Sequence, residues 1–187
     1  MDKEKIKKAV KELLEAIGED PNKPNLEKTP ERVAVLYEEI FSGKKADHKE
    51  ILKVNHSLNH DEMVIVKDVP FYSMCEHDLL PFFGKCHIGY IPENDRIVGI
   101  NRLAMIVDAM SKKLQIQEQL TTEIANTIME NVKPKGVGIV IEARHLCMEM
   151  KGLKQPETKI ITSAVRGIFR KDIKTREEFL KLIKNVY

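Results

Sequence analysis

The sequence has few of the residues that mark a disordered, fibrous or low-complexity chain. Its 187 residues include only 9 glycines and 8 prolines, while hydrophobic residues make up 42% and charged residues 32%. This composition excludes a disordered, collagen-like or low-complexity protein. The length is that of one domain, or of one domain with a small helical extension, and it is sufficient to bury a hydrophobic core.

The sequence also lacks a charge imbalance and a long apolar run. The 31 lysines and arginines nearly balance the 29 aspartates and glutamates, which leaves a formal charge of +2. The composition therefore predicts binding to neither nucleic acid nor a membrane. No segment approaches the roughly 18 apolar residues of a membrane-spanning helix. The N-terminal residues have the pattern of an amphipathic helix rather than of a signal peptide, so we expect a cytoplasmic protein.

Cysteine is scarce as well. The chain has three, Cys75, Cys86 and Cys147, and an odd number cannot all pair within one chain. A reducing compartment disfavours disulfides further, so we expect free thiols or metal ligands. The chain contains neither a P-loop nor a G-x-G-x-x-G sequence, the two common glycine-rich phosphate-binding motifs.

Two amphipathic helices are predicted at the N-terminus. Apolar residues recur at helical spacing over residues 2–17, and Gly18 then supplies a stop. Thr29 followed by Pro30 predicts an N-cap with proline at the first helical position, which opens a second helix that ends at Gly43.

The segment that follows these helices, residues 44–61, is polar and shows no period. It contains His48, His56 and His60, and we interpret it as a connection with at most one short strand and with solvated histidines. We therefore predict an N-terminal helical region over residues 1–57 and a second domain over residues 58–187.

The second domain has the pattern of alternating strands and helices. Four segments rich in valine and isoleucine predict strands, at Met63–Val69, Gly84–Ile91, Val137–Met148 and Lys159–Phe169. Between the second and third strands, two helices are predicted at about residues 101–112 and 116–132. A capping box of Thr175 and Glu178 predicts the start of a last helix. This order favours an α+β fold, an antiparallel sheet with helices on one face, plus the N-terminal helical extension.

Two clusters of cysteine and histidine lie far apart in the sequence. Cys75, His77 and Asp78 lie within four consecutive positions, and His145 and Cys147 lie at the end of a predicted strand. Two such clusters are typical of a zinc site to which two elements contribute. The spacing lacks the C-x-x-C pairs of structural zinc modules and the signature of zinc deaminases. From residue types alone, buried thiols and hydrogen-bonded core histidines are the slightly favoured explanation of the same pattern.

Longer motifs carry a resemblance to a known family. They are FYSMCEH at residues 71–77, GKCHIGYIP at 84–92, LQIQEQLT at 114–121, EARHLCM at 142–148, KTREEFL at 174–180 and KTPERVA at 28–34. In this order, and over nearly the whole chain, they resemble GTP cyclohydrolase I. The resemblance implies the tunnelling fold for the catalytic domain, in which subunits pool their sheets into a barrel. It also implies a homo-oligomer, usually a decamer, with active sites between subunits.

The resemblance further implies a reaction and a metal. GTP and water give formate and 7,8-dihydroneopterin triphosphate, the entry to folate or biopterin synthesis. Cys75 and Cys147 match two of the family's three zinc ligands, and Asp78 stands where the family has the third, a histidine. Aspartate can replace histidine as a zinc ligand. Its charge makes a bound water less acidic, and its hard oxygen makes iron or manganese conceivable as well as Zn²⁺.

The resemblance also implies which residues handle the guanine base. His77 and His145 match the family's catalytic histidines. Glu118, with Gln117 beside it, matches the carboxylate that holds the edge of guanine. A carboxylate can accept hydrogen bonds from both N1–H and the 2-amino group, a pair of donors that adenine does not offer.

The phosphate contacts follow from the same resemblance. Arg32, Arg102 and Lys151 match basic residues that meet the triphosphate, with Lys151 in place of a usual arginine. Met105 stands where the family usually has another arginine, and losing that fork-shaped donor weakens phosphate binding or favours a less phosphorylated ligand. Arg166 is an unexpected base that can compensate.

Three interpretations follow from these matches. The chain is an active GTP cyclohydrolase, a relative that hydrolyses another guanine nucleotide, or a non-catalytic nucleotide-binding or assembly protein on the same scaffold. His77, His145 and Glu118 favour the first two interpretations, whereas Asp78 and Met105 favour the last two.

Overall fold

The computed structural model describes residues 1–55, 60–152 and 154–184. The chain divides into two compact units, Met1–Ser42 and Gly43–Tyr187, and each is described by itself. The domain boundary predicted at residues 57 and 58 lies outside the described residues, as does His56, and both expectations stay predictions.

The first unit consists of two helices, α1 (Lys3–Ala16) and α2 (Thr29–Ile40), and both predicted helices are confirmed. The carboxylate of Asp2 caps α1 by accepting a hydrogen bond from the backbone N–H of Lys5. The predicted cap of α2 is wrong by one position. Thr29 is already helical, and the residue before it serves as N-cap without a side-chain hydrogen bond.

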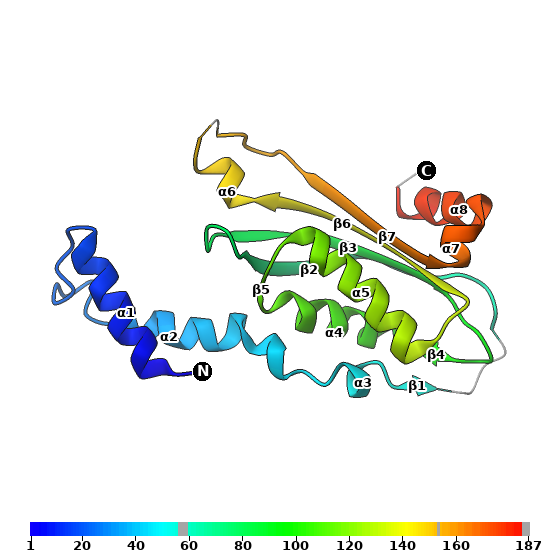
Figure 1. Ribbon diagram of the computed structural model, residues 1–187, viewed down its shortest axis with the longest axis horizontal. Helices are drawn as coiled ribbons and strands as arrows, with labels where there is room; N and C mark the ends of the chain where they lie inside the picture. The colour runs from blue at the N-terminus through cyan, green and yellow to red at the C-terminus, as the bar shows by residue number, and fades with distance from the viewer. Residues whose placement is uncertain (56–59, 153, 185–187) are drawn as a thin grey trace. The chain divides into compact units, whose positions relative to one another are not determined.

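The rest of the described chain forms a five-stranded main sheet and a small two-stranded sheet, with helices around them (Figure 1). Its elements are η1 (Ser42–Lys45), α3 (His48–Ile51), β1 (Val54–Asn55), β2 (Val64–Cys75), β3 (Pro81–Ile91), β4 (Ile97–Val98), α4 (Ile100–Ser111), β5 (Leu114–Gln115), α5 (Gln117–Val132), β6 (Gly136–His145), α6 (Leu146–Glu149), β7 (Ile160–Gly167), α7 (Ile168–Lys171) and α8 (Ile173–Ile183). The order of the four long strands and the main helices is the predicted one.

The main sheet has the strand order β5-β2-β3-β6-β7. β2, β3, β6 and β7 are antiparallel, while the short β5 runs parallel to β2. The predicted α+β class with an antiparallel sheet is therefore confirmed. The first strand continues past Pro70 to Cys75 and is longer than predicted, because Phe71, Ser73 and Cys75 alternate inward and keep one buried face to the strand's end.

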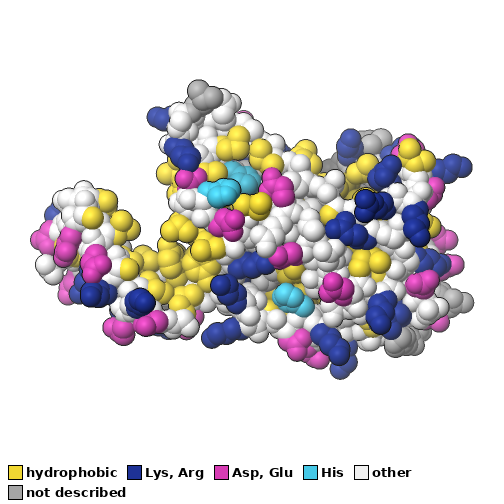
Figure 2. All heavy atoms as spheres, in the orientation of Figure 1, with side chains coloured by type: hydrophobic (Ala, Val, Ile, Leu, Met, Phe, Trp, Pro, Cys, Tyr) yellow, Lys and Arg dark blue, Asp and Glu magenta, His cyan; other side chains and the backbone are white. Residues whose placement is uncertain are grey.

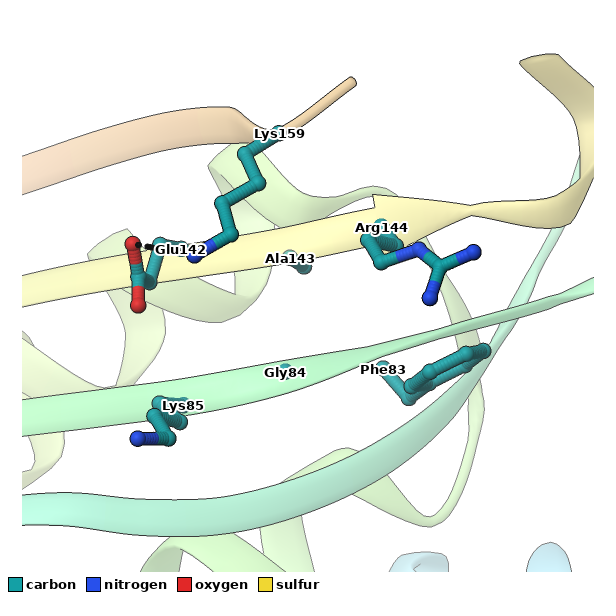
Figure 3. A pocket seen from close by; sticks show the side chains of 7 residues that line it. All are labelled: Phe83, Gly84, Lys85, Glu142, Ala143, Arg144 and Lys159. Atoms are coloured by element: carbon teal, nitrogen blue, oxygen red, sulfur yellow. Dashed lines mark ion pairs between the residues drawn. The ribbon is translucent and has the colours of Figure 1, made fainter. Parts of the chain in front are cut away.

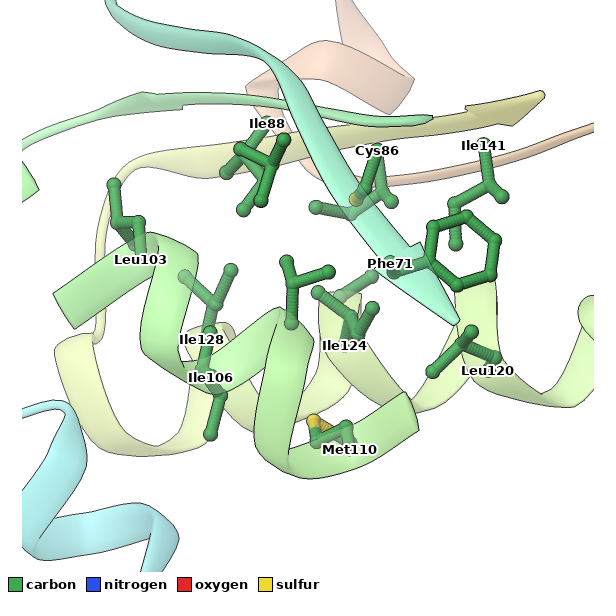
Figure 4. Close-up of a cluster of buried hydrophobic side chains, with 14 of the residues drawn as sticks. Phe71, Cys86, Ile88, Leu103, Ile106, Met110, Leu120, Ile124, Ile128 and Ile141 are labelled. Carbon is green, nitrogen blue, oxygen red and sulfur yellow. The ribbon is translucent and has the colours of Figure 1, made fainter. Parts of the chain in front are cut away.

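The hydrophobic core lies between the sheet and the two central helices, α4 and α5 (Figure 4). The side chains that meet there include Phe71, Cys86, Ile88, Leu103, Ile106, Met110, Leu120, Ile124, Ile128 and Ile141. Each large apolar side chain buried in this way stabilises the fold by about 1.5–3 kcal/mol. Burial also raises the pKa of the Cys86 thiol, so this cysteine is a core residue rather than a metal ligand.

The C-terminal helices α7 and α8 differ from the expectation that all helices lie on one face, because they pack on the face of the sheet opposite to α4 and α5. Phe169 and Phe179 lie over the paired glycines Gly89 and Gly138 of β3 and β6. A Cβ atom on Gly89 would come within 2.6 Å of the Phe179 ring. Only glycine allows this close approach of helix and sheet.

The start of the last helix differs from the prediction. α8 begins at Ile173, and the carboxylate of Asp172 accepts from the backbone N–H of Thr175 at 2.9 Å. The capping box of Thr175 and Glu178 is therefore wrong, because an aspartate three positions before Thr175 already occupies the N-cap.

The connection before β2 is more ordered than predicted. It contains the expected short strand, β1, but also the helical turns η1 and α3. His48 is half-buried with its Nε2 atom fully buried, so the expectation that it is solvated is wrong. His60 is half-buried as well.

Across the described residues, every helix is too short or too polar to cross a membrane.

Candidate active site

The residues singled out around the two Cys/His clusters come together at one end of the sheet. β2 ends there at Cys75, β6 ends there at His145, and α5 begins beside them at Gln117. The register explains this meeting, because Phe82 at the start of β3 pairs with both Ser73 of β2 and His145 of β6. We call this the site end of the sheet.

The turn that links β2 to β3 carries the first cluster. Backbone hydrogen bonds from Cys75 N to Leu80 O, at 2.9 Å, and from Leu79 N to Cys75 O, at 3.1 Å, close the turn. Leu79 has a φ of 53°, in the left-handed region, which lets the chain reverse in so few residues. Cys75 is therefore buried at the strand end, while His77 is exposed in the turn.

The imidazole of His145 is held in one orientation by two neighbours. It stacks on the Phe82 ring, with 4.8 Å between ring centroids and an angle of 11° between the planes. Its Nε2 atom lies 2.8 Å from Oε1 of Gln117.

Gln117 decides which nitrogen of His145 carries the hydrogen. The side chain is buried, and its Nε2 donates to the carbonyl oxygens of Ile141 and Ile160, each at 3.1 Å. Carbonyls only accept, so the amide orientation is fixed and its Oε1 faces His145 as an acceptor. His145 therefore donates from Nε2, and in the neutral ring the free lone pair is on Nδ1.

Two opposing effects act on the pKa of His145. Burial lowers this pKa, and the negative charge of Glu118 raises it to a smaller extent. Glu118 itself is exposed in the first turn of α5, where the helix N-terminus favours a carboxylate. The site end thus pairs a neutral imidazole with a nearby anionic acceptor.

The two cysteines of the predicted metal site are neighbours. β6 ends at His145 rather than at the predicted Met148, and the turn α6 then brings Cys147 to Cys75. The pKa of Cys147 is raised, first by burial, then by the charges of Cys75 and Asp78, and by a hydrogen bond with the Cys75 thiol.

The third predicted ligand, Asp78, has a different partner. Its Oδ1 accepts from Nζ of Lys151 at 2.5 Å, and the side chains of Asp78 and Lys151 are 30% and 60% exposed. This hydrogen bond is the first cause of a raised pKa at Lys151, and the charges of Cys147 and Cys75 also raise it. Asp78, Lys151 and the two cysteines therefore form one group, which we call the thiol cluster.

The donor atoms of the thiol cluster suit a divalent metal, since thiolate and carboxylate are both zinc ligands. Within residues 1–55, 60–152 and 154–184, however, three or more His, Cys, Asp or Glu side chains are nowhere assembled in a geometry that holds a metal. Cys75 and Cys147 converge, whereas the Asp78 carboxylate is engaged by Lys151. Two candidate ligands, Cys75 and Cys147, are therefore close together, whereas the third, Asp78, is hydrogen-bonded to Lys151.

The remaining predicted phosphate contacts lie elsewhere. Arg102, in the first turn of α4, donates to the carbonyl oxygens of Glu50 and Ile51 at 2.7 and 3.0 Å. Arg166 pairs in register with Val137, eight residues along β6 from His145, which corresponds to about 26 Å of strand. Within one chain, neither residue lies beside His145.

Two other predicted residues complete this account. Arg32 is exposed on α2, in the other unit of the chain. Met105 is 52% exposed on α4.

Sequence reasoning missed the residues that support Gln117. The hydroxyl of Thr162, on β7, lies 3.0 Å from Gln117 Nε2 and 2.6 Å from the hydroxyl of Thr121. Thr121 in turn donates to the carbonyl oxygen of Gln117 at 2.7 Å. Only the register of β6 and β7 brings Thr162 to the start of α5, so local sequence contained no signal for it.

A pocket on the face of the sheet opposite to α4 and α5 lies apart from these residues (Figure 3). Its lining includes Phe83, Lys85, Glu142, Arg144 and Lys159, and Lys159, just before β7, forms an ion pair with Glu142 of β6 at 3.5 Å. None of the thiol cluster lines this pocket, so it is separate from the chemistry at the site end.

The surface view agrees with the position of the site. Figure 2 shows histidine side chains beside acidic side chains, close to the area that α6 occupies in Figure 1.

Comparisons with known proteins are consistent with this geometry. The family described as GTP cyclohydrolase I matches residues 6–184. A GTP cyclohydrolase 1 of Caldanaerobacter subterraneus subsp. tengcongensis is 57% identical over 185 residues, covering 99% of this chain and 98% of that protein. Proteins of the same name from Thermoanaerobacter pseudethanolicus and Clostridioides difficile are 56% and 53% identical, covering 99% and 98% of this chain and 98% and 97% of their own lengths. The chain therefore belongs to the GTP cyclohydrolase I family.

Proposed function

We propose that the protein hydrolyses GTP to formate and 7,8-dihydroneopterin triphosphate, the activity for which its relatives are named. The observation that carries the proposal is the arrangement of His145, Gln117 and Glu118 beside the paired cysteines at the site end of the sheet. We also propose that residues 58–187 form the catalytic domain and that the protein acts in the cytoplasm.

Glu118 is the proposed reader of the base. Its exposed carboxylate can accept from N1–H and from the 2-amino group of guanine at once. Gln117, one position earlier, is buried and holds His145 rather than the base, so its role is to position the imidazole.

His145 is the proposed proton carrier. Because Gln117 occupies its Nε2–H, the proton is exchanged at Nδ1. The neutral ring can take a proton there from the attacking water and pass it to the guanine ring nitrogen as the imidazole ring of the base opens. His77, exposed in the turn after β2, is the second proposed proton-transfer residue.

Cys75, Cys147 and Asp78 are the proposed metal ligands, with Zn²⁺ as the metal and iron or manganese as alternatives. A divalent metal there would supply the Lewis acidity that makes water nucleophilic near neutral pH.

Lys151, Arg32, Arg102 and Arg166 are the proposed phosphate contacts. Residues that lie apart in one chain can meet the triphosphate when different subunits contribute to one site. The exposed Met105 in place of an arginine favours a second candidate substrate, a guanine nucleotide with fewer phosphates.

Assembly into a homo-oligomer, a decamer by the family's pattern, is part of the proposal. β7 forms one edge of the main sheet, and such an edge requires a partner to avoid uncontrolled pairing. Light scattering that finds a 21.5 kDa monomer at micromolar concentration would contradict this part.

The activity is tested by incubating the protein with GTP while formate and pterin fluorescence are followed and metal content is measured on the same sample. We expect formate and pterin in equal amounts. GDP and GMP in parallel reactions distinguish the second candidate. A metal-loaded protein that binds guanine nucleotides and releases no formate from any of them would leave the non-catalytic interpretation.

A further inference from the structure

We propose that Lys151 and a divalent metal compete for the carboxylate of Asp78, and that the phosphates of a bound nucleotide relieve the competition by drawing Lys151 away. Nucleotide binding would then strengthen metal binding. This inference rests on the proposed function, because it takes the nucleotide and the metal to share the site end of the sheet.

The contact that carries the inference joins two separate elements. Asp78 lies in the turn between β2 and β3, and Lys151 lies just beyond α6. Their 2.5 Å hydrogen bond links positions 73 residues apart in the sequence, so it is a product of the fold rather than of local chain geometry.

The pair lies at the two thiols, and this position makes it relevant to a metal. Asp78 and Lys151 act in opposite directions on Cys147, the carboxylate raising its pKa and the ammonium lowering it. Lys151 also feels the charges of both Cys75 and Cys147. An ammonium this close to the thiols repels a divalent cation that enters between them.

Lys151 is free to move without disturbing the core. Its side chain is 60% exposed on a flexible four-carbon stem, and the residue after it, Gly152, has a φ of 58°. A phosphate group offers the ammonium a charge-assisted hydrogen bond at least as strong as the one to Asp78. Once Lys151 has exchanged partners, the Asp78 carboxylate is released toward the two thiols.

The coupling must be reciprocal. If a nucleotide raises the affinity for metal by some factor, the metal raises the affinity for nucleotide by the same factor. Lys151 is thus a positioning residue that links two binding events.

The first experiment measures metal affinity without nucleotide, in a double-mutant cycle. The wild type, Lys151→Met, Asp78→Asn and the double variant are equilibrated with Co²⁺ in a metal buffer, and thiolate-to-cobalt absorption reports occupancy. We expect Lys151→Met to bind Co²⁺ about fivefold or more tightly than the wild type, and most of this gain to be lost in the Asp78→Asn background, where only the repulsion between the Lys151 ammonium and the cation remains. The exposed Lys154→Met, in the same loop, is the matched control and should leave affinity unchanged.

Two results of this cycle would overturn the competition. One is a Lys151→Met protein with unchanged or weaker Co²⁺ binding, and the other is an equal gain with and without Asp78. Because Asp78 and Lys151 are partly or largely exposed, the variants should fold, and circular dichroism checks that they do.

The second experiment adds GTP at a fixed concentration of free Co²⁺, in the His145→Ala background so that the nucleotide stays intact. GTP should increase Co²⁺ occupancy when Lys151 is present and have little effect when it is methionine. An equal response in both proteins would overturn the coupling. Failure of the proposed function has a different signature, because the cycle without nucleotide would still succeed while the metal-loaded wild type released no formate.

Discussion

The two ends of the main sheet are packed in opposite ways, one by apolar contacts and the other by buried hydrogen bonds. At the far end, Phe169 and Phe179 press against the paired glycines Gly89 and Gly138, and the contact is entirely apolar. At the site end, Gln117 is just as buried, yet its amide is polar. It donates hydrogen bonds to two carbonyl oxygens and accepts one from the imidazole of His145.

This difference indicates which end contributes mainly to stability and which contributes to function. An apolar contact needs only shape, whereas a buried amide costs free energy unless all its partners are present. The site end buries such amides, and one of their atoms, Gln115 Oε1, has no hydrogen-bond partner among the described residues. The free-energy cost of burying these polar groups is explained if they orient His145 for catalysis. The apolar packing at the far end supplies stability that offsets this cost.

The largest expected effect is on stability at the far end. Phe179→Ala should lower the free energy of unfolding by about 3–5 kcal/mol, because it leaves a cavity over Gly89 and Gly138. Urea denaturation measures this, and Leu182→Ala, on the exposed side of the same helix, is the control. The kcat of the folded fraction should be unchanged. A matching loss of kcat would erase the distinction between the two ends.

The second effect concerns both stability and activity. Gln117→Leu leaves the carbonyl oxygens of Ile141 and Ile160 unpaired and should cost about 1–3 kcal/mol of stability. It also removes the acceptor that fixes His145, so kcat should fall by about 100-fold. The control is Gln119→Leu, an exposed glutamine on the same helix. If Gln117→Leu lowered stability alone, Gln117 would be a structural residue like those of the far end.

The third effect is mainly on binding. Glu118→Gln replaces an acceptor with a group whose donors face those of guanine, so affinity for GTP should fall by about 1–3 kcal/mol. The free energy of unfolding should fall by less, about 0.3–1 kcal/mol at most, because only the interaction of the carboxylate with the helix N-terminus is lost. Calorimetry with GTP and ATP measures the selectivity, and Glu130→Gln, exposed near the other end of α5, is the matched control. Equal losses for both nucleotides would show that Glu118 does not read the base.

The two ends also differ in how far the sequence predicted them. Apolar periodicity predicted the core helices and the four long strands, because burial of one face fixes both period and register. The resemblance predicted that Cys75, His145 and Glu118 act together, and the fold does bring them to one end of the sheet.

The rest depended on tertiary contacts that local sequence does not encode. The support of Gln117 by Thr162 requires the register of β6 and β7. The pairing of Asp78 with Lys151 requires a turn and a helical end to meet. The true cap of α8 was missed for a simpler reason, because the capping-box pattern at Thr175 concealed the stronger signal of Asp172.

The smallest expected effect lies between the two ends, at His87 in the middle of β3. This side chain is 7% exposed, and its Nδ1 accepts from the backbone N–H of Asp68 at 3.1 Å. Burial lowers the pKa of His87, and Nδ1 can accept that bond only while it is unprotonated. As the pH falls below the ordinary histidine value, the unfolded chain takes up a proton that the folded protein resists. Stability should therefore rise with pH across this range and level off above it.

His87→Asn tests this directly, since the asparagine oxygen can accept from Asp68 N–H without titrating. The free energy of unfolding in urea, measured at pH 5.5 and pH 7.5, should depend less on pH in the variant than in the wild type. The difference in this free energy between the two proteins should therefore be smaller at pH 5.5. The other histidines are present in both proteins, so their contributions cancel when the two pH dependences are compared. An identical pH dependence in both proteins would mean that the folded state protonates His87 as readily as the unfolded state does, and that the middle of the sheet tolerates a charge that its apolar end does not.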